Sequence, residues 1–116
     1  MACDEGLVER IRSELQDVMG IDEKRMFGGV CFTLSGNMVL GVVKDELMVR
    51  LGEAAYAEAL RQPHVREMDF TGRPMKGYVF VASAGLAEDA DLRRWTALGC
   101  AFVGKLPPKR SKQPKN

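Results

Sequence analysis

The first apolar pattern of the chain predicts a helix over residues 4–19. Large apolar residues recur there at the three- and four-residue spacing that places side chains on one face of a helix. They are Leu7, Val8, Ile11, Leu15, Val18 and Met19. Asp4 is a suitable N-cap, because its carboxylate can accept a hydrogen bond from a backbone amide of the first turn. Gly20 is expected to end the helix, since glycine adopts the left-handed conformation without strain.

Three antiparallel strands are predicted after this helix. The first is interrupted at Gly28-Gly29, which we interpret as a bulge or break between a short segment and a longer apolar one. The sequence Ser35-Gly36-Asn37 is typical of a tight turn and separates the first strand from the second. The third strand shows the alternation of a half-buried strand. The predicted segments are 24–27 and 30–34 in the first strand, 38–43 in the second and 47–51 in the third.

A helix, a hairpin and a final helix are predicted for the rest of the chain. Pro63 ends the middle helix, because its ring cannot continue a helix. The hairpin loop contains glycine and proline, which favour a turn. The final helix has apolar residues at helical spacing and is followed by Pro107-Pro108. The predicted segments are helix 52–62, strands 67–70 and 77–82 with loop 71–76 between them, and helix 89–104.

The order of these elements, α-β-β-β-α-β-β-α, predicts an α+β fold. Helices on one face of a five-stranded antiparallel sheet would form a two-layer sandwich. A chain of 116 residues is long enough for one hydrophobic core and too short for two stable ones. We expect a folded domain over residues 1–106 and a basic, disordered tail over residues 107–116.

The charge of the chain is unevenly distributed. The net charge is +1 and the last twelve residues carry +5 without an acidic residue, which leaves −4 for residues 1–104. Such a tail is either a solubilising terminus or a site of weak, non-specific contact with nucleic acid. Sequence-specific DNA binding is not expected, since the tail has no base-reading motif. No apolar run approaches the ~20 residues that span a bilayer, so we expect no membrane partner.

The cysteine and histidine content argues against a catalytic or metal site. Cys3, Cys31 and Cys100 are odd in number and widely spaced, which favours a reducing compartment, the cytoplasm, over a disulfide framework. A cysteine nucleophile would need His64, the only histidine, beside it. No two of these residues have zinc-ligand spacing. We expect a protein that is not an enzyme and that has no metal and no cofactor.

Two glycine-containing segments provide the candidate binding residues. The first, Arg25-Met26-Phe27-Gly28-Gly29, leads into a strand, so its glycines favour close backbone approach over phosphate binding. The second extends from Asp69 to Gly77 and places Arg73 on a loop, where its guanidinium could bind a carboxylate or phosphate. A salt bridge from Arg73 to Asp69 or Glu67 is an equal alternative. The candidate ligand- or partner-binding residues are Arg25, Phe27, Gly28, Gly29, Arg73, Met75 and Lys76.

These two segments, with the Gly36-Asn37-Met38 turn and the helix that contains Tyr56, resemble the N-terminal domain of the TfoX/Sxy family. The resemblance covers residues 4–108, and members are linked to the regulation of bacterial competence genes. It implies the fold order given above and a non-enzymatic cytoplasmic regulator that binds a protein partner, in the transcription machinery. Full-length competence regulators carry a second, C-terminal domain, so this chain looks like a stand-alone N-terminal domain. The alternative is a small-molecule or anion-binding domain that uses the Arg73 loop.

The predicted sheet is apolar on both faces, which has a consequence for self-association. Residues 39–43 and 79–81 are apolar at successive positions, so both faces of their strands are apolar. A single layer of helices covers only one face, and large exposed apolar patches usually mark an interface. We therefore predict that a homodimer or a bound partner covers part of the second face. The alternative is that the final helix, with Trp95, wraps around to cover it.

Overall fold

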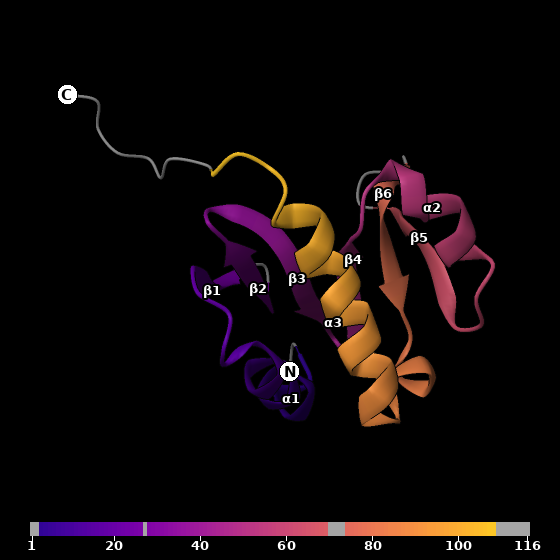
Figure 1. The fold of residues 1–116 in the computed structure, drawn as a ribbon. Coiled ribbons are helices and arrows are strands. Elements are labelled where there is room, and N and C mark those ends of the chain that lie inside the picture. Colours follow the sequence, from indigo (N-terminus) through magenta and orange to yellow (C-terminus); the bar gives the residue numbers. More distant parts are fainter. Residues whose placement is uncertain (1–2, 27, 70–73, 109–116) are drawn as a thin grey trace.

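The computed structural model describes residues 3–26, 28–69 and 74–108 of the chain and contains one sheet with helices packed against it (Figure 1). The helices are α1 (Glu5–Leu15), α2 (Glu53–Leu60) and α3 (Asp89–Val103), with a short 3-10 helix, η1 (Ser83–Leu86), before α3. The strands are β1 (Ile21–Met26), β2 (Gly29–Leu34), β3 (Asn37–Val43), β4 (Glu46–Arg50), β5 (Val65–Asp69) and β6 (Pro74–Val81). The sheet order is β1-β2-β3-β4-β6-β5, and neighbouring strands are antiparallel. The predicted α+β fold class is confirmed.

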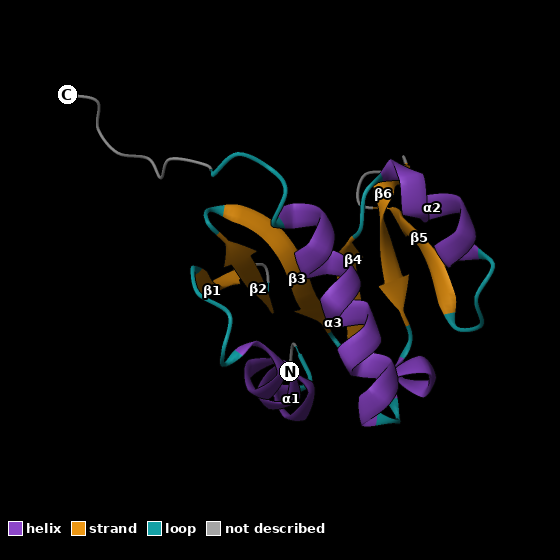
Figure 2. Ribbon diagram, viewed as in Figure 1, coloured by secondary structure: helices purple, strands orange, loops and turns teal. Residues whose placement is uncertain are grey.

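The main hydrophobic core fills the space between the sheet and the helices. Leu47 and Val49 of β4 and Val79 and Val81 of β6 are fully buried in it, as expected for alternate positions of half-buried strands. Trp95 of α3 is the largest side chain of this core and is 1% exposed. Figure 2 shows α3 lying in front of the central strands and α2 beside β5 and β6. The helices therefore form the second layer of the fold.

The sheet has six strands rather than the predicted five, because the first predicted strand is a hairpin. β1 and β2 are antiparallel neighbours, and Met26 pairs with Gly29. Gly28 has a φ of 76°, a left-handed conformation that glycine adopts without steric cost. The predicted bulge at Gly28-Gly29 is therefore a turn. β1 is difficult to predict because residues 22–25 are all charged and show no apolar alternation.

Helix α1 is shorter than predicted. Asp4 is its N-cap, as expected, and the Asp4 Oδ1 atom accepts a hydrogen bond from the amide of Leu7 at 3.1 Å. The helix ends at Leu15, and the side chain of Met19 is 85% exposed. The predicted place of Met19 on the buried stripe is therefore wrong.

The exposed position of Met19 makes a small, specific prediction. Replacing Met19 with glutamine is expected to change the free energy of unfolding by less than about 0.5 kcal/mol, the usual limit for surface substitutions. Urea denaturation followed by circular dichroism would measure this. A loss of about 2 kcal/mol, typical of a truncated core residue, would place Met19 in the core instead.

The turn between β2 and β3 forms as the sequence Ser35-Gly36-Asn37 predicts. Ser35 has a φ of 51° and Gly36 a φ of 87°. Two central residues with positive φ are characteristic of the hairpin turn that matches the twist of antiparallel strands. Gly20, predicted to end α1, instead lies before β1, and its carbonyl accepts a hydrogen bond from the Ser35 amide at 2.9 Å. This bond joins the start of β1 to the turn.

The remaining elements agree with the prediction in type and place. α2 ends before Pro63, and α3 lies within the predicted helix 89–104. The strands of the second hairpin are longer than predicted, because β5 begins at Val65 and β6 at Pro74. Residues 74–76 of the predicted loop therefore belong to β6, and residues 71–73 lie outside the described residues. The predicted boundary between a domain and a tail at residue 106 remains a prediction.

The face of the sheet opposite the helices carries a second, smaller apolar cluster. Its buried members are Met48, Met68 and Phe80, with Met38, Val43 and Tyr78 packed against them. These three buried side chains are at most 5% exposed in the single chain. Trp95 belongs to the main core, so the alternative in which Trp95 covers this face is wrong. The homodimer remains a prediction.

Candidate functional site

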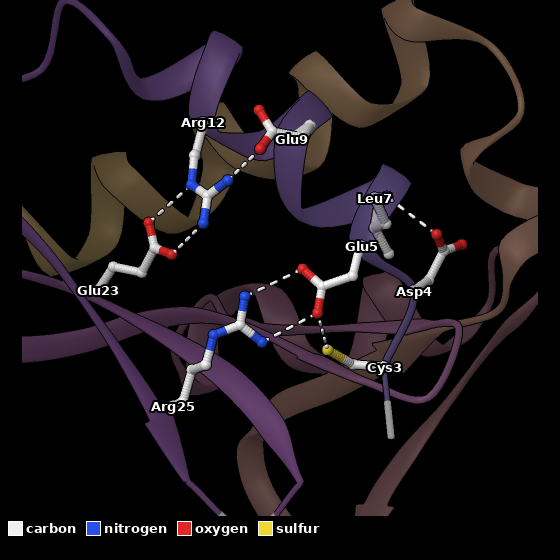
Figure 3. Close-up of polar contacts among 8 residues, drawn as sticks. All are labelled: Cys3, Asp4, Glu5, Leu7, Glu9, Arg12, Glu23 and Arg25. Carbon is white, nitrogen blue, oxygen red and sulfur yellow. Dashed lines mark hydrogen bonds and ion pairs between the residues drawn. The ribbon is translucent and has the colours of Figure 1, made fainter. Parts of the chain in front are cut away.

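Arg25, the first candidate binding residue, is held by helix α1. Its Nη1 atom donates to Glu5 Oε2 at 2.9 Å and its Nη2 atom to Glu5 Oε1 at 3.0 Å (Figure 3). Two parallel hydrogen bonds are the strongest form of an arginine–carboxylate pair and fix the plane of the guanidinium. Because Arg25 lies on the edge strand β1, the pair joins α1 to the edge of the sheet.

A second pair joins the same two elements. Arg12 of α1 donates to Glu23 of β1 from Nε at 2.9 Å and from Nη2 at 2.5 Å, and it also contacts Glu9 on its own helix. We call Glu5, Arg12, Glu23 and Arg25 the α1–β1 clasp. Hydrogen bonds from Arg25 lower the pKa of the Glu5 carboxyl group, and those from Arg12 lower the pKa of Glu23. The clasp is solvent-accessible, so each pair contributes modestly to stability.

Acidification is expected to weaken the α1–β1 clasp. The folded-state pKa of the Glu5 and Glu23 carboxyl groups is lowered, so their contribution to stability is present above the ordinary pKa of glutamate. It is lost as the pH falls through the lowered folded-state pKa. Urea denaturation at low salt over a series of acidic pH values should show a steeper loss for the wild type than for the double variant Glu5→Gln/Glu23→Gln.

The control for this experiment is Glu58→Gln, which changes an exposed carboxylate of α2 that lies outside the clasp. This variant is expected to follow the wild-type pH profile. Identical profiles for the wild type and the double variant would contradict a stabilising role of the clasp.

The glycines of the first candidate segment serve the backbone, as their interpretation from the sequence expected. Gly28 forms the β1–β2 turn, and Gly29 is buried against β3. A Cβ atom at Gly29 would overlap the carbonyl oxygen of Val42. Phe27 lies outside the described residues. The described part of this segment thus closes a hairpin and allows two strands to approach closely.

In the second candidate segment, Gly77 has a structural role. It has a φ of 92°, and its carbonyl accepts hydrogen bonds from the amides of Leu51 at 2.8 Å and Gly52 at 3.1 Å. These bonds fix the connection from β4 to α2. Met75 and Lys76 are exposed at the start of β6. Arg73, and with it both predicted contacts of its guanidinium, lies outside the described residues.

The three cysteines are poor nucleophiles in this fold. Burial raises the pKa of the Cys31 and Cys100 thiols. Desolvation and the carboxylate of Glu5 raise the pKa of Cys3, whose thiol donates to Glu5 Oε2 at 3.6 Å. A thiol with a raised pKa is protonated at neutral pH and therefore reacts slowly. All three cysteines are free.

The described part of the chain holds neither a cluster of metal ligands nor a helix that could span a membrane. Within residues 3–26, 28–69 and 74–108, no three histidine, cysteine, aspartate or glutamate side chains are grouped as metal ligands would be. Over the same ranges, no helix combines the length and the apolar character that a crossing of the bilayer requires.

Arg50 of β4 is a candidate that sequence analysis missed. Its Cζ atom lies 5.5 Å from the ring centroid of Tyr78 and 5.8 Å from that of Phe102, distances at which a cation and a ring attract. Its Nη1 atom donates to the carbonyl of Met38 at 3.4 Å. In the sequence, Arg50 is one polar position in an alternating strand. Its two rings come from β6 and α3, so only the tertiary structure places them around it.

Comparison with known proteins adds one finding to this geometry. Neither a curated protein nor a solved structure matches the chain significantly. The model of the TfoX N-terminal domain matches residues 13–103, which is most of the chain and extends from the last turn of α1 to the end of α3. This match includes both candidate segments, the β2–β3 turn and helix α2. The chain belongs to the TfoX N-terminal domain family.

Proposed function

We propose that this chain is a non-catalytic, cytoplasmic protein-interaction domain with a role in the regulation of transcription. Membership of the TfoX N-terminal domain family is the observation that carries the proposal. The regulated genes are those of bacterial competence, as the resemblance to the TfoX/Sxy family implies. The partner is a protein of the transcription machinery.

The use of the candidate residues within the fold supports a binding role over a catalytic one. Arg25 is paired with Glu5, so its two-bond geometry is already satisfied inside the chain. Gly29 allows β2 and β3 to approach closely, and Gly77 holds the connection from β4 to α2. The thiols have raised pKa values.

Affinity capture from the source cell tests this proposal. The full chain carries a small C-terminal tag and is expressed at its natural level, and captured proteins are quantified against a control with the tag on an unrelated domain of similar size. We expect repeated enrichment of one or more proteins of the transcription machinery. Capture that repeatedly recovers no such protein would contradict the proposal.

An anion-binding domain that uses the Arg73 loop is the second candidate. The exposed Lys76, three residues after Arg73 in the sequence, favours it, because its cation can attract an anionic ligand. Titration with inorganic phosphate, followed by amide chemical shifts, tests it. Saturable shifts at Lys76 that are lost in Arg73→Gln would support this candidate, and unchanged spectra would exclude it.

Two further proposals concern assembly. A homodimer through the second sheet face predicts a mass of twice 12.8 kDa by light scattering, and a monomer at micromolar concentration would exclude it.

Contact of residues 105–116 with nucleic acid predicts a DNA complex that is strongly weakened by salt and is lost when these residues are deleted. Binding that persists after the deletion would assign the contact elsewhere.

A further inference from the structure

Arg50 is the one half-buried arginine among the described residues that forms no ion pair with a carboxylate. Six of the eight described arginines form an ion pair with a carboxylate, namely Arg10, Arg12, Arg25, Arg66, Arg93 and Arg94. Of the two that remain, Arg61 is exposed at the end of α2, whereas Arg50 is half-buried. A half-buried guanidinium usually has a carboxylate partner, because removing its charge from water is costly. Within the described residues, the interaction partners of the Arg50 guanidinium are two aromatic rings and one carbonyl group.

The surroundings of Arg50 hold its guanidinium in a fixed orientation. Tyr78 pairs with Arg50 across β4 and β6, and Phe102 extends from the last turn of α3. The ring of Phe102 lies over Gly52, where a Cβ atom would be 2.5 Å from Phe102 Cε1. Because Gly52 has no Cβ atom, the ring of Phe102 can reach the end of β4. A guanidinium placed between rings keeps its plane and loses little freedom when it forms two further hydrogen bonds.

Most N–H groups of Arg50 remain available for a partner. A guanidinium has five N–H donors, and the described residues accept only the one bond from Nη1, to Met38. A carboxylate could therefore bind its free edge with two parallel hydrogen bonds. Among the residues that the structure describes, no carboxylate accepts these hydrogen bonds.

Further positive charge gathers at this end of the sheet. Lys76 precedes Gly77 on β6, and the amide of Lys105 donates to the carbonyl of Phe102 at 3.1 Å. The side chain of Asn37 donates to the carbonyl of Pro107, which places the start of the C-terminal segment beside the first residue of β3. An acidic partner is therefore favoured here over a basic one.

The apolar neighbours favour a protein segment over a nucleic acid. Met38 and Tyr78, the neighbours of Arg50 in the second apolar cluster, are partly buried. Methionine side chains adapt to varied apolar partners. The rings of Tyr78 and Phe102 already contact Arg50, whereas single-stranded nucleic acids need free aromatic rings on which bases can stack.

We propose that Arg50 anchors an acidic segment of a protein partner. A carboxylate of the partner accepts two hydrogen bonds from the Arg50 guanidinium, and apolar side chains of the same segment contact Met38 and Tyr78. Lys76 and Lys105 strengthen the attraction at longer range. This inference rests on the proposed function as a protein-interaction domain, and it names the surface and the chemistry of the partner.

A defined peptide tests the inference without knowledge of the natural partner. The probe is a short synthetic peptide in which glutamate alternates with leucine and phenylalanine, and its control has glutamine in place of each glutamate. Nuclear magnetic resonance follows the Nε–Hε signal of Arg50 in the full chain. We expect a saturable shift with the acidic peptide and none with the neutral one.

Three variants separate anchoring from general charge. Arg50→Gln should weaken the binding of the acidic peptide about tenfold, and Arg50→Lys should recover part of the affinity because it keeps the charge but not the two-bond geometry. Arg61→Gln removes the same charge from an arginine that has no ring partner, and it should change the affinity less than about twofold. Each variant is first compared with the wild type by its amide spectrum and melting temperature. Arg50→Lys provides the test if Arg50→Gln does not fold.

Several results would overturn the inference. These are an unshifted Arg50 signal at millimolar acidic peptide, equal binding of the neutral peptide, and equal losses in Arg50→Gln and Arg61→Gln. Tighter binding of a single-stranded oligonucleotide that depends on Arg50 would assign the site to nucleic acid instead. If the acidic peptide does not bind at Arg50 but the wild-type chain still captures a transcription protein from cells, the proposed function stands. A failure of that capture counts against the proposed function itself.

Discussion

Replacing Trp95 with alanine is expected to lower the free energy of unfolding by about 3–5 kcal/mol, the usual cost of truncating a large aromatic side chain in a core. Trp95 is 1% exposed and lies between α3 and the sheet, where its neighbours cannot fully collapse into the space it leaves. Small domains are stable by about 5–15 kcal/mol, so the variant would be at the limit of folding. Urea denaturation followed by far-ultraviolet circular dichroism measures the loss, since Trp95 is the only tryptophan and fluorescence is removed with it.

The control for this prediction is Trp95→Phe, which keeps an aromatic ring at the same place. We expect it to cost less than half as much as the alanine variant, because it leaves a smaller cavity. A loss below about 1 kcal/mol for Trp95→Ala would mean that α3 is not packed on the sheet as described.

The second large effect is expected for Gly29→Ala, which adds a single methyl group. The new Cβ atom would overlap the carbonyl oxygen of Val42 on the neighbouring strand, and backbone atoms of a paired strand cannot move aside cheaply. We expect a loss of about 2–3 kcal/mol, at the upper end of the range for overpacked sites. Thermal and urea denaturation would both show it.

The matched control is Gly6→Ala on the exposed side of α1. The added Cβ atom there would lie 3.2 Å from Asp4 Oδ1, the end of a flexible side chain, and alanine favours a helix by up to about 1 kcal/mol over glycine. Stability should be unchanged or increased. Equal losses at the two glycines would contradict the close strand approach at Gly29.

Local signals predicted much of this fold from the sequence. The cap at Asp4, the turn at Ser35-Gly36 and the apolar faces of β3, β4 and α3 depend on residues that are close in the chain. β1 and the end of α1 were not predictable in the same way. The charged residues 22–25 form a strand because they pair with β2 across the hairpin and bond to α1, and such contacts leave no apolar period in the sequence.

The candidate site was less predictable than the fold. The sequence singles out Arg25 as a candidate ligand-binding residue, but its partner Glu5 lies on another element and makes Arg25 part of the clasp. Arg50, in contrast, looks like an ordinary surface arginine in the sequence. Its neighbours Tyr78 and Phe102 come close to it only in the folded chain. Whether an arginine is paired or free depends on tertiary contacts, which a single sequence does not contain.

We propose that the motif residue Arg25 acts through the fold and that the domain functions by binding a protein partner. The most direct test is calorimetric titration of the captured transcription protein with the wild-type chain and with Arg25→Gln, under conditions in which both are folded. We predict saturable binding with the same dissociation constant for both chains, and a slightly lower melting temperature for Arg25→Gln because one exposed pair is lost. The absence of binding by the wild type, or a tenfold loss of affinity in Arg25→Gln at an unchanged melting temperature, would contradict the claim.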